Sequence, residues 1–111
     1  MSQWRIIIPR GATFDQTITI TGQSDIGSAT AWRFVFAMPN SAPFLVASTT
    51  NGYVVATNQT NSKRLVLPPT LTQTLPLGNG RFDFEVEWAG GVIQRYASGL
   101  QMQVIPATGE V

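Results

Sequence analysis

One segment alternates large apolar residues with charged residues along its whole length. Residues 81–88 read Arg-Phe-Asp-Phe-Glu-Val-Glu-Trp. Successive side chains of a β-strand point to opposite faces, so a strand here has one apolar face and one charged face. A helix would scatter both kinds of residue around its surface. The segment therefore predicts a β-strand that covers a core with only one of its faces.

The same period of two recurs elsewhere in the chain. Residues 14–20 place Phe14, Ile18 and Ile20 on one face, and residues 31–38 alternate aromatic residues with mostly small ones. Near the C-terminus two short runs, 92–96 and 100–104, are also typical of strands. In total the pattern predicts about seven or eight strands, separated by regularly spaced turn signals rich in Gly, Pro and Asn.

This arrangement favours an all-β fold over a parallel α/β fold. We expect an antiparallel, immunoglobulin-like β-sandwich, with one short helical turn near 70–75. Asn51-Gly52 is typical of a tight hairpin turn, and Gly90-Gly91 of a second one. At 111 residues the chain predicts a single domain, residues 1–111.

Composition and charge exclude several classes of function. Charged residues make up 12% of the chain and the net charge is +1. A nucleic-acid binder needs clustered Lys and Arg, whereas the seven basic residues here are spread over the whole chain. The chain has no Cys and no His, which removes disulfides, thiolate nucleophiles and the commonest zinc ligands. We expect neither a nucleic-acid partner nor a cofactor.

The N-terminal residues predict no membrane partner. Only three consecutive Ile residues precede Pro9. This run is too short for the core of a signal peptide or for a membrane span. We therefore expect synthesis in a cytoplasm.

The acidic residues are the main candidates for acid–base chemistry. Asp83, Glu85 and Glu87 share the charged face of residues 81–88, where they would form the edge of a cation site, a carboxylate dyad, or a solvated outer face. The pattern favours the solvated face, with Arg81 and a cross-strand partner such as Arg95 balancing the charge. On this interpretation the protein is not an enzyme and has no catalytic residues.

The three tryptophans and the first strand are the candidates for binding. Trp32 and Trp88 fall on apolar faces, which predicts that both are buried in the core. Trp4 has no such constraint and fits either a core residue or an interface anchor. Residues 4–8 are a candidate edge strand or dimer contact, or else an ordinary strand of the sandwich. The candidate interface residues are Trp4, Ile6 and Ile8.

Several segments, taken in order, resemble a family of small β-sandwich proteins encoded in the structural gene modules of tailed bacteriophages. They are Gly11-Ala12-Thr13-Phe14, Trp32-Arg33-Phe34, Thr49-Thr50-Asn51-Gly52, Leu75-Pro76-Leu77-Gly78 with the strand that follows, and Gly91-Val92 with Arg95 and Gly99. Two departures are clear: an additional Asn79-Gly80 predicts a longer turn before residues 81–88, and Asp25-Ile26-Gly27-Ser28 replaces the usual first loop.

The resemblance implies a component of the virion, made in the bacterial cytoplasm. It most closely suggests a capsid decoration or cement protein that bridges coat subunits and forms a small homo-oligomer. Its partner would be the major capsid protein or another virion protein. A tail or baseplate adaptor of the same fold is an alternative, and a glycan-binding module is another.

Overall fold

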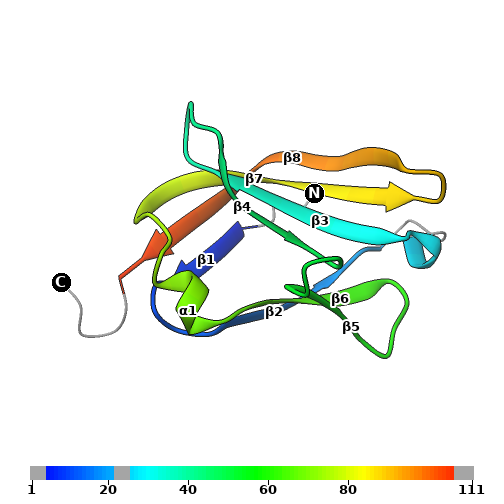
Figure 1. Ribbon diagram of the computed structural model, residues 1–111, viewed down its shortest axis with the longest axis horizontal. Helices are drawn as coiled ribbons and strands as arrows, with labels where there is room; N and C mark the ends of the chain where they lie inside the picture. The colour runs from blue at the N-terminus through cyan, green and yellow to red at the C-terminus, as the bar shows by residue number, and fades with distance from the viewer. Residues whose placement is uncertain (1–4, 22–25, 107–111) are drawn as a thin grey trace.

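Two β-sheets form the protein in the computed structural model, which describes residues 5–21 and 26–106 (Figure 1). The larger sheet has the strand order β1-β8-β7-β3-β4, and the smaller has the order β2-β6-β5. The strands are β1 (Arg5–Pro9), β2 (Phe14–Thr19), β3 (Ala31–Ala37), β4 (Pro43–Ser48), β5 (Val54–Ala56), β6 (Ser62–Leu67), β7 (Gly78–Trp88) and β8 (Val92–Ile105). The all-β prediction and the upper strand number are thus confirmed.

The core lies between the two sheets and contains buried residues from both. Aromatic side chains from the neighbouring strands β3 and β7 dominate it. Phe34 stacks on Phe84 with ring centres 4.9 Å apart, and Trp32 meets the edge of Phe84 at 5.3 Å. Leu65 and Leu67 of the smaller sheet belong to the same core. The predicted burial of Trp32 is confirmed.

The alternation in residues 81–88 is confirmed with two exceptions. Phe82, Phe84 and Val86 are buried, as their spacing predicts. Glu85 is also buried, because two arginines flank it, as described below. Trp88 packs against the core but is only partly buried, so its predicted core position is confirmed in part. Trp88 is only half-buried because it stands at the end of β7, where the strand passes the edge of the core.

Strand β7 begins three residues earlier than the pattern indicated. Asn79-Gly80 is part of the strand, so the predicted longer turn at this point is wrong. Gly80 pairs with Met102 of β8. A Cβ on Gly80 would lie 2.7 Å from the Ala37 carbonyl oxygen, which only glycine avoids.

The sheets are not purely antiparallel. Strand β1 runs parallel to β8, with Ile6 opposite Met102 and Ile8 opposite Val104. All other strand pairs are antiparallel. The first and last strands of the chain are therefore neighbours, which short-range patterns do not reveal.

The two runs predicted near the C-terminus form one strand, β8. Two register shifts against β7 accommodate the extra residues. At one of them Gly99 has a φ of 68°, and its N–H donates to the Asp83 carboxylate at 2.9 Å. A β-bulge with glycine in the left-handed region explains why the sequence looked interrupted here.

A short helix, α1 (Pro69–Thr72), lies where the helical turn was predicted, beginning one residue earlier. Leu75 beyond it is buried, and Leu71 packs against the core. The Thr72 hydroxyl donates to the Ala12 carbonyl at 2.8 Å, which ties the helix to the β1–β2 connection. A turn of 3-10 helix, η1 (Ile26–Ser28), was not predicted and places Ile26 in the core.

The turn at Asn51-Gly52 does not close a hairpin. It carries the chain from β4 of the larger sheet to β5 of the smaller one, so the hairpin prediction is wrong. The turn chemistry was nevertheless detected correctly. Gly52 has a φ of 88°, and the Asn51 side chain accepts from Ser48 N–H at 2.9 Å and donates to the Val46 carbonyl at 2.7 Å. By contrast, Gly90-Gly91 closes the predicted β7–β8 hairpin.

Phe84→Ala should destabilise the fold by about 3–5 kcal/mol, because it opens a cavity between Trp32, Phe34 and Tyr96. Urea denaturation measures the change, with the exposed Val92→Ala as the control. A loss below about 1 kcal/mol would contradict the assignment of Phe84 to the core.

Gly52→Val should lower the melting temperature, because a β-branched residue at positive φ costs about 1–3 kcal/mol. Gly52→Asn should be tolerated better, since Asn adopts the left-handed region more readily. A Cβ at this position meets no neighbour within 4 Å, so steric clash does not contribute to the difference in melting temperature between the two variants. Equal melting temperatures for the two variants would refute the role of backbone conformation.

Candidate functional site

The predicted interface residues lie mostly inside the protein. Ile6 and Ile8 are fully buried, because they face Met102 and Val104 on the inner side of the larger sheet. Their side chains therefore belong to the core and cannot meet a partner in this fold. Trp4 lies outside the described residues. Of the alternatives left open for residues 4–8, the structure supports an edge strand, since β1 (Arg5–Pro9) is the outermost strand of its sheet among the described residues.

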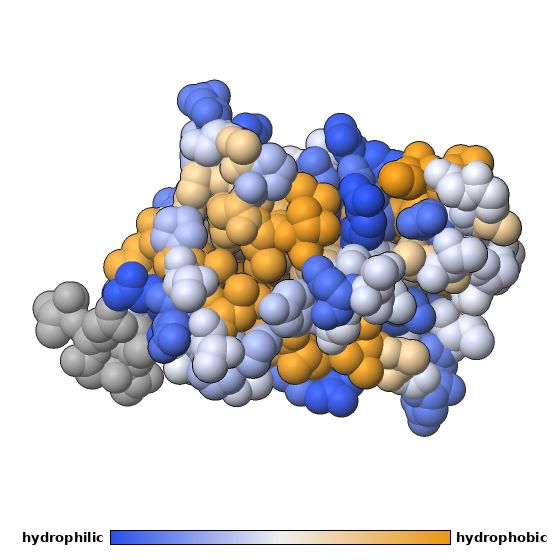
Figure 2. Space-filling model, in the orientation of Figure 1, coloured by the Kyte–Doolittle hydropathy of each residue, from blue (hydrophilic) through white to orange (hydrophobic). Residues whose placement is uncertain are grey.

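Within residues 5–21 and 26–106, the most exposed large hydrophobic residues lie at the tip of the β7–β8 hairpin. Val92 is 60% exposed and Ile93 is 49% exposed. Being adjacent in a strand, they point to opposite faces, so the tip is apolar on both sides. Figure 2 shows hydrophobic residues at the end of the molecule where this hairpin turns. We call Trp88, Val92 and Ile93 the hairpin tip.

Sequence reasoning passed over the hairpin tip, although a signal was present. Two aliphatic residues directly follow Gly90-Gly91, so one of them must point outward in any two-layer fold. Trp88 pairs with Val92 across the hairpin, and its indole N–H donates to Gln94 Oε1 at 3.0 Å. The indole is thus fixed in place beside Val92.

The charged residues predicted for the outer face form a row across three strands. Glu85 of β7 pairs with Arg33 of β3 on one side and with Arg95 of β8 on the other. Arg33 Nη2 lies 2.7 Å from one Glu85 oxygen, and Arg95 Nη2 lies 3.5 Å from the other. The flanking arginine side chains explain how Glu85 can be buried on an outer face.

Arg95 was predicted to balance these acids, and its role is confirmed. Its Nε also lies 3.8 Å from Asp83. Arg33 was missed, because pairing between β3 and β7 could not be read from the sequence. Arg81, the other predicted partner, makes no ion pair within residues 5–21 and 26–106.

This outer face offers little to a catalytic mechanism or to a cation. The Asp83 carboxylate is engaged by Gly99 N–H and Arg95, and Glu85 by two guanidinium groups. Positive charge therefore already occupies the positions a metal ion would need. In the part of the chain that the structure describes, no group of three or more His, Cys, Asp or Glu side chains is placed to hold a metal.

A second ion pair lies on the smaller sheet. Arg64 of β6 donates two hydrogen bonds to the Asp15 carboxylate of β2, one of them from Nε at 3.1 Å. These bonds hold the pKa of Asp15 below its ordinary value, although partial desolvation opposes them. The same bonds raise the pKa of Arg64. The pair is solvent-exposed, so its effect on stability is small.

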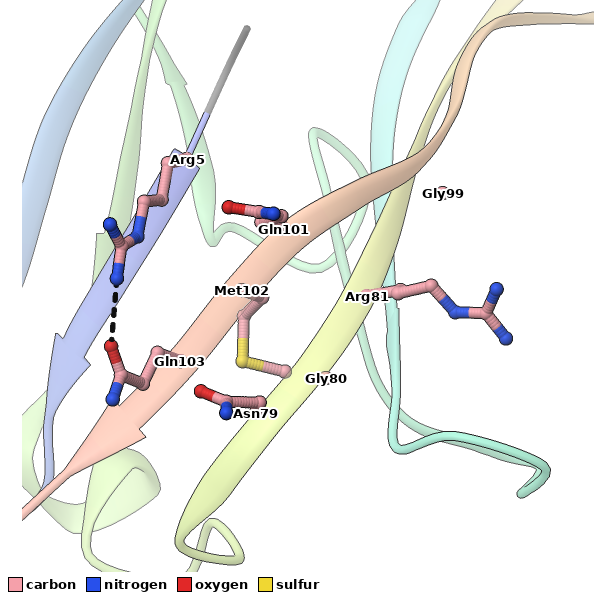
Figure 3. A pocket seen from close by; sticks show the side chains of 8 residues that line it. All are labelled: Arg5, Asn79, Gly80, Arg81, Gly99, Gln101, Met102 and Gln103. Atoms are coloured by element: carbon pink, nitrogen blue, oxygen red, sulfur yellow. Dashed lines mark hydrogen bonds between the residues drawn. The ribbon is translucent and has the colours of Figure 1, made fainter.

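Two shallow hollows mark the outer face of the larger sheet. The larger, of about 510 Å³, crosses β1, β8 and β7 (Figure 3). The smaller, of about 270 Å³, continues across β7 to β3, Ser41 and the first residue of β4. Both are lined by Arg81 and Gly99. We refer to the two hollows together as the outer groove.

No protein-family model matches the chain, and no curated protein is similar enough to count as a relative. Among the described residues, no helix is long and apolar enough to cross a membrane.

Glu85→Gln should destabilise the protein by about 1–3 kcal/mol, because it leaves the half-buried Arg33 without its carboxylate and leaves Arg95 with Asp83 alone. Glu87→Gln on the same face is the matched control and should change stability by less than about 0.5 kcal/mol. Chemical denaturation of both variants measures the difference. Equal stabilities would show that the charge row is not part of the folded framework.

Proposed function

We propose that this protein is a structural component of the virion of a tailed bacteriophage, and that it acts as a capsid decoration or cement protein. In this role it bridges coat subunits and stabilises the shell as a small homo-oligomer. Its partner is the major capsid protein or another virion protein. The ordered set of motifs that resembles small phage β-sandwich proteins supports the assignment.

The proposal extends to the fold. We take the five-stranded and three-stranded sheets as the two layers of an immunoglobulin-like sandwich. The single core shared by the sheets and the largely antiparallel pairing support this interpretation. In such a scaffold the edge strands, β1 and β4 in one sheet and β2 and β5 in the other, can contact neighbours.

The observation that carries the proposed role is the hairpin tip. Full burial of an aliphatic side chain contributes about 1.5–3 kcal/mol, so covering Val92 and Ile93 would contribute a few kcal/mol at each contact. That gain is modest for one contact, but it is repeated at every copy on a particle. An exposed apolar tip on a folded, weakly charged domain fits adhesion better than catalysis.

The tryptophans give less support to a glycan-binding module. Sugar binding on aromatic rings needs an exposed platform, whereas Trp32 is fully buried. Trp88 is half-buried and its N–H is already bonded to Gln94. A tail or baseplate adaptor would use the same surfaces as a cement protein. Only the position of the protein in the particle distinguishes these two roles.

The test is binding of the purified protein to capsid shells from which it has been removed. We expect co-sedimentation of the wild-type protein, and a loss of affinity of at least about tenfold in the double variant Val92→Asp/Ile93→Asp. Val55→Asp is the matched control, because Val55 is comparably exposed but lies on the smaller sheet.

Failure of the wild-type protein to bind any shell would overturn the capsid role. Localisation to the tail by cryo-electron microscopy would favour the adaptor role instead. If the tip variant and the Val55 control bound the shells equally well, the hairpin tip would not be the surface that contacts the capsid.

A further inference from the structure

The basic residues, which look scattered in the sequence, gather on one face of the folded protein. Arg33 and Arg95 pair with Glu85, and Arg81 and Arg5 are both paired in register with Gln101 of β8. Because paired residues point to the same face, all four of these arginines lie on the outer face of the larger sheet. They are four of the seven basic residues in the chain.

The charges on this face are not evenly compensated. Arg33 and Arg95 are matched by Glu85 and Asp83. Arg5 and Arg81 have no carboxylate partner within residues 5–21 and 26–106, and both line the outer groove. Figure 3 shows Arg5 on β1 reaching toward Gln103, to whose side-chain oxygen its Nη2 donates at 3.2 Å, and Arg81 projecting from β7 on the side away from β8.

Both hollows of the outer groove mix polar and apolar residues in their linings. Amide side chains of Asn79, Gln101 and Gln103 line the larger hollow. Val35, Ala37 and Pro43 line the smaller one. Among the residues that the structure describes, Asp83 is the only acid in either lining, and its carboxylate is engaged by Gly99 N–H and by Arg95.

We propose that the outer groove binds an acidic segment of a partner protein in extended conformation. Arginine recognises carboxylates through paired N–H donors, and the uncompensated charge on this face complements negative charge. Neighbouring strands lie about 4.8 Å apart, so the backbones of β1 and β7 are about 9.6 Å apart. A peptide crossing the sheet can reach Arg5 and Arg81 with different carboxylates and place apolar side chains in the smaller hollow.

A nucleic-acid backbone fits this groove less well. Phosphate recognition depends on a run of cations, whereas only two arginines here lack a carboxylate partner among the described residues. The apolar lining also has no role in binding phosphates. The inference does not depend on the proposed virion role, because the isolated protein suffices to test it.

The probe is a short fluorescein-labelled peptide in which Glu alternates with Val, titrated with the protein at low ionic strength. Fluorescence anisotropy should show binding, and the same peptide with Gln in place of Glu should not bind. Arg5→Gln/Arg81→Gln should weaken binding about tenfold, since it removes two exposed ion pairs. Arg64→Gln on the smaller sheet removes a positive charge elsewhere and should leave binding unchanged.

Amide shifts in NMR spectra supply a second, independent measurement. Addition of the Glu peptide should perturb Asn79, Gln101 and Gln103 and leave Val55 unaffected. Circular dichroism melting confirms that the variants fold, as expected for exposed side chains.

Three results would overturn the inference: equal binding of the Glu and Gln peptides, an equal loss in the Arg64 variant, or shifts confined to the hairpin tip. Tighter binding of a single-stranded DNA oligonucleotide, with the same dependence on Arg5 and Arg81, would assign the groove to phosphates and also overturn it.

Discussion

The register between β3 and β7 is the constraint on which both faces of the larger sheet depend. It places Phe34 opposite Phe84 on the inner face and, one residue later along β7, Arg33 opposite Glu85 on the outer face. A slip of one residue would send the aromatic rings into water and the arginine into the core. The aromatic packing and the charge row therefore select the same alignment, one by burial and the other by complementary charge.

The local features of the sequence predicted the local structure well, because alternation and turn chemistry are short-range effects. Residues 81–88, the burial of Trp32 and the helical turn were all identified from spacing alone. Pairing partners were not, since nothing in Ile6 or Ile8 specifies that they face Met102 and Val104. The same limitation explains why Ile6 and Ile8 were read as interface residues, and why Arg33 was overlooked as the partner of Glu85.

Two glycines inside strands led to wrong predictions, one of a turn and one of a break between strands. Asn79-Gly80 resembled a turn but lies within β7, where Gly80 lets the Ala37 carbonyl approach closely. Gly99 seemed to divide two strands but belongs to a bulge inside β8. Asn51-Gly52 was correctly recognised as a turn, yet local chemistry cannot tell whether a turn returns within one sheet or crosses to another. The candidate contact surfaces were not predicted for a related reason. The hairpin tip and the outer groove are formed by residues of different strands, which lie side by side only in the folded protein.

The parallel pairing of β1 with β8 has a consequence for how the molecule forms. Arg5 and Gln103, joined by a hydrogen bond, are 98 positions apart in the chain. The larger sheet therefore stays incomplete until the residues of β8 have left the ribosome, and β1 cannot pair with β8 before then. Folding dominated by such distant contacts is slow, in the range of milliseconds to seconds. During that interval Ile6 and Ile8 have no partner strand, so this apolar segment is vulnerable to aggregation.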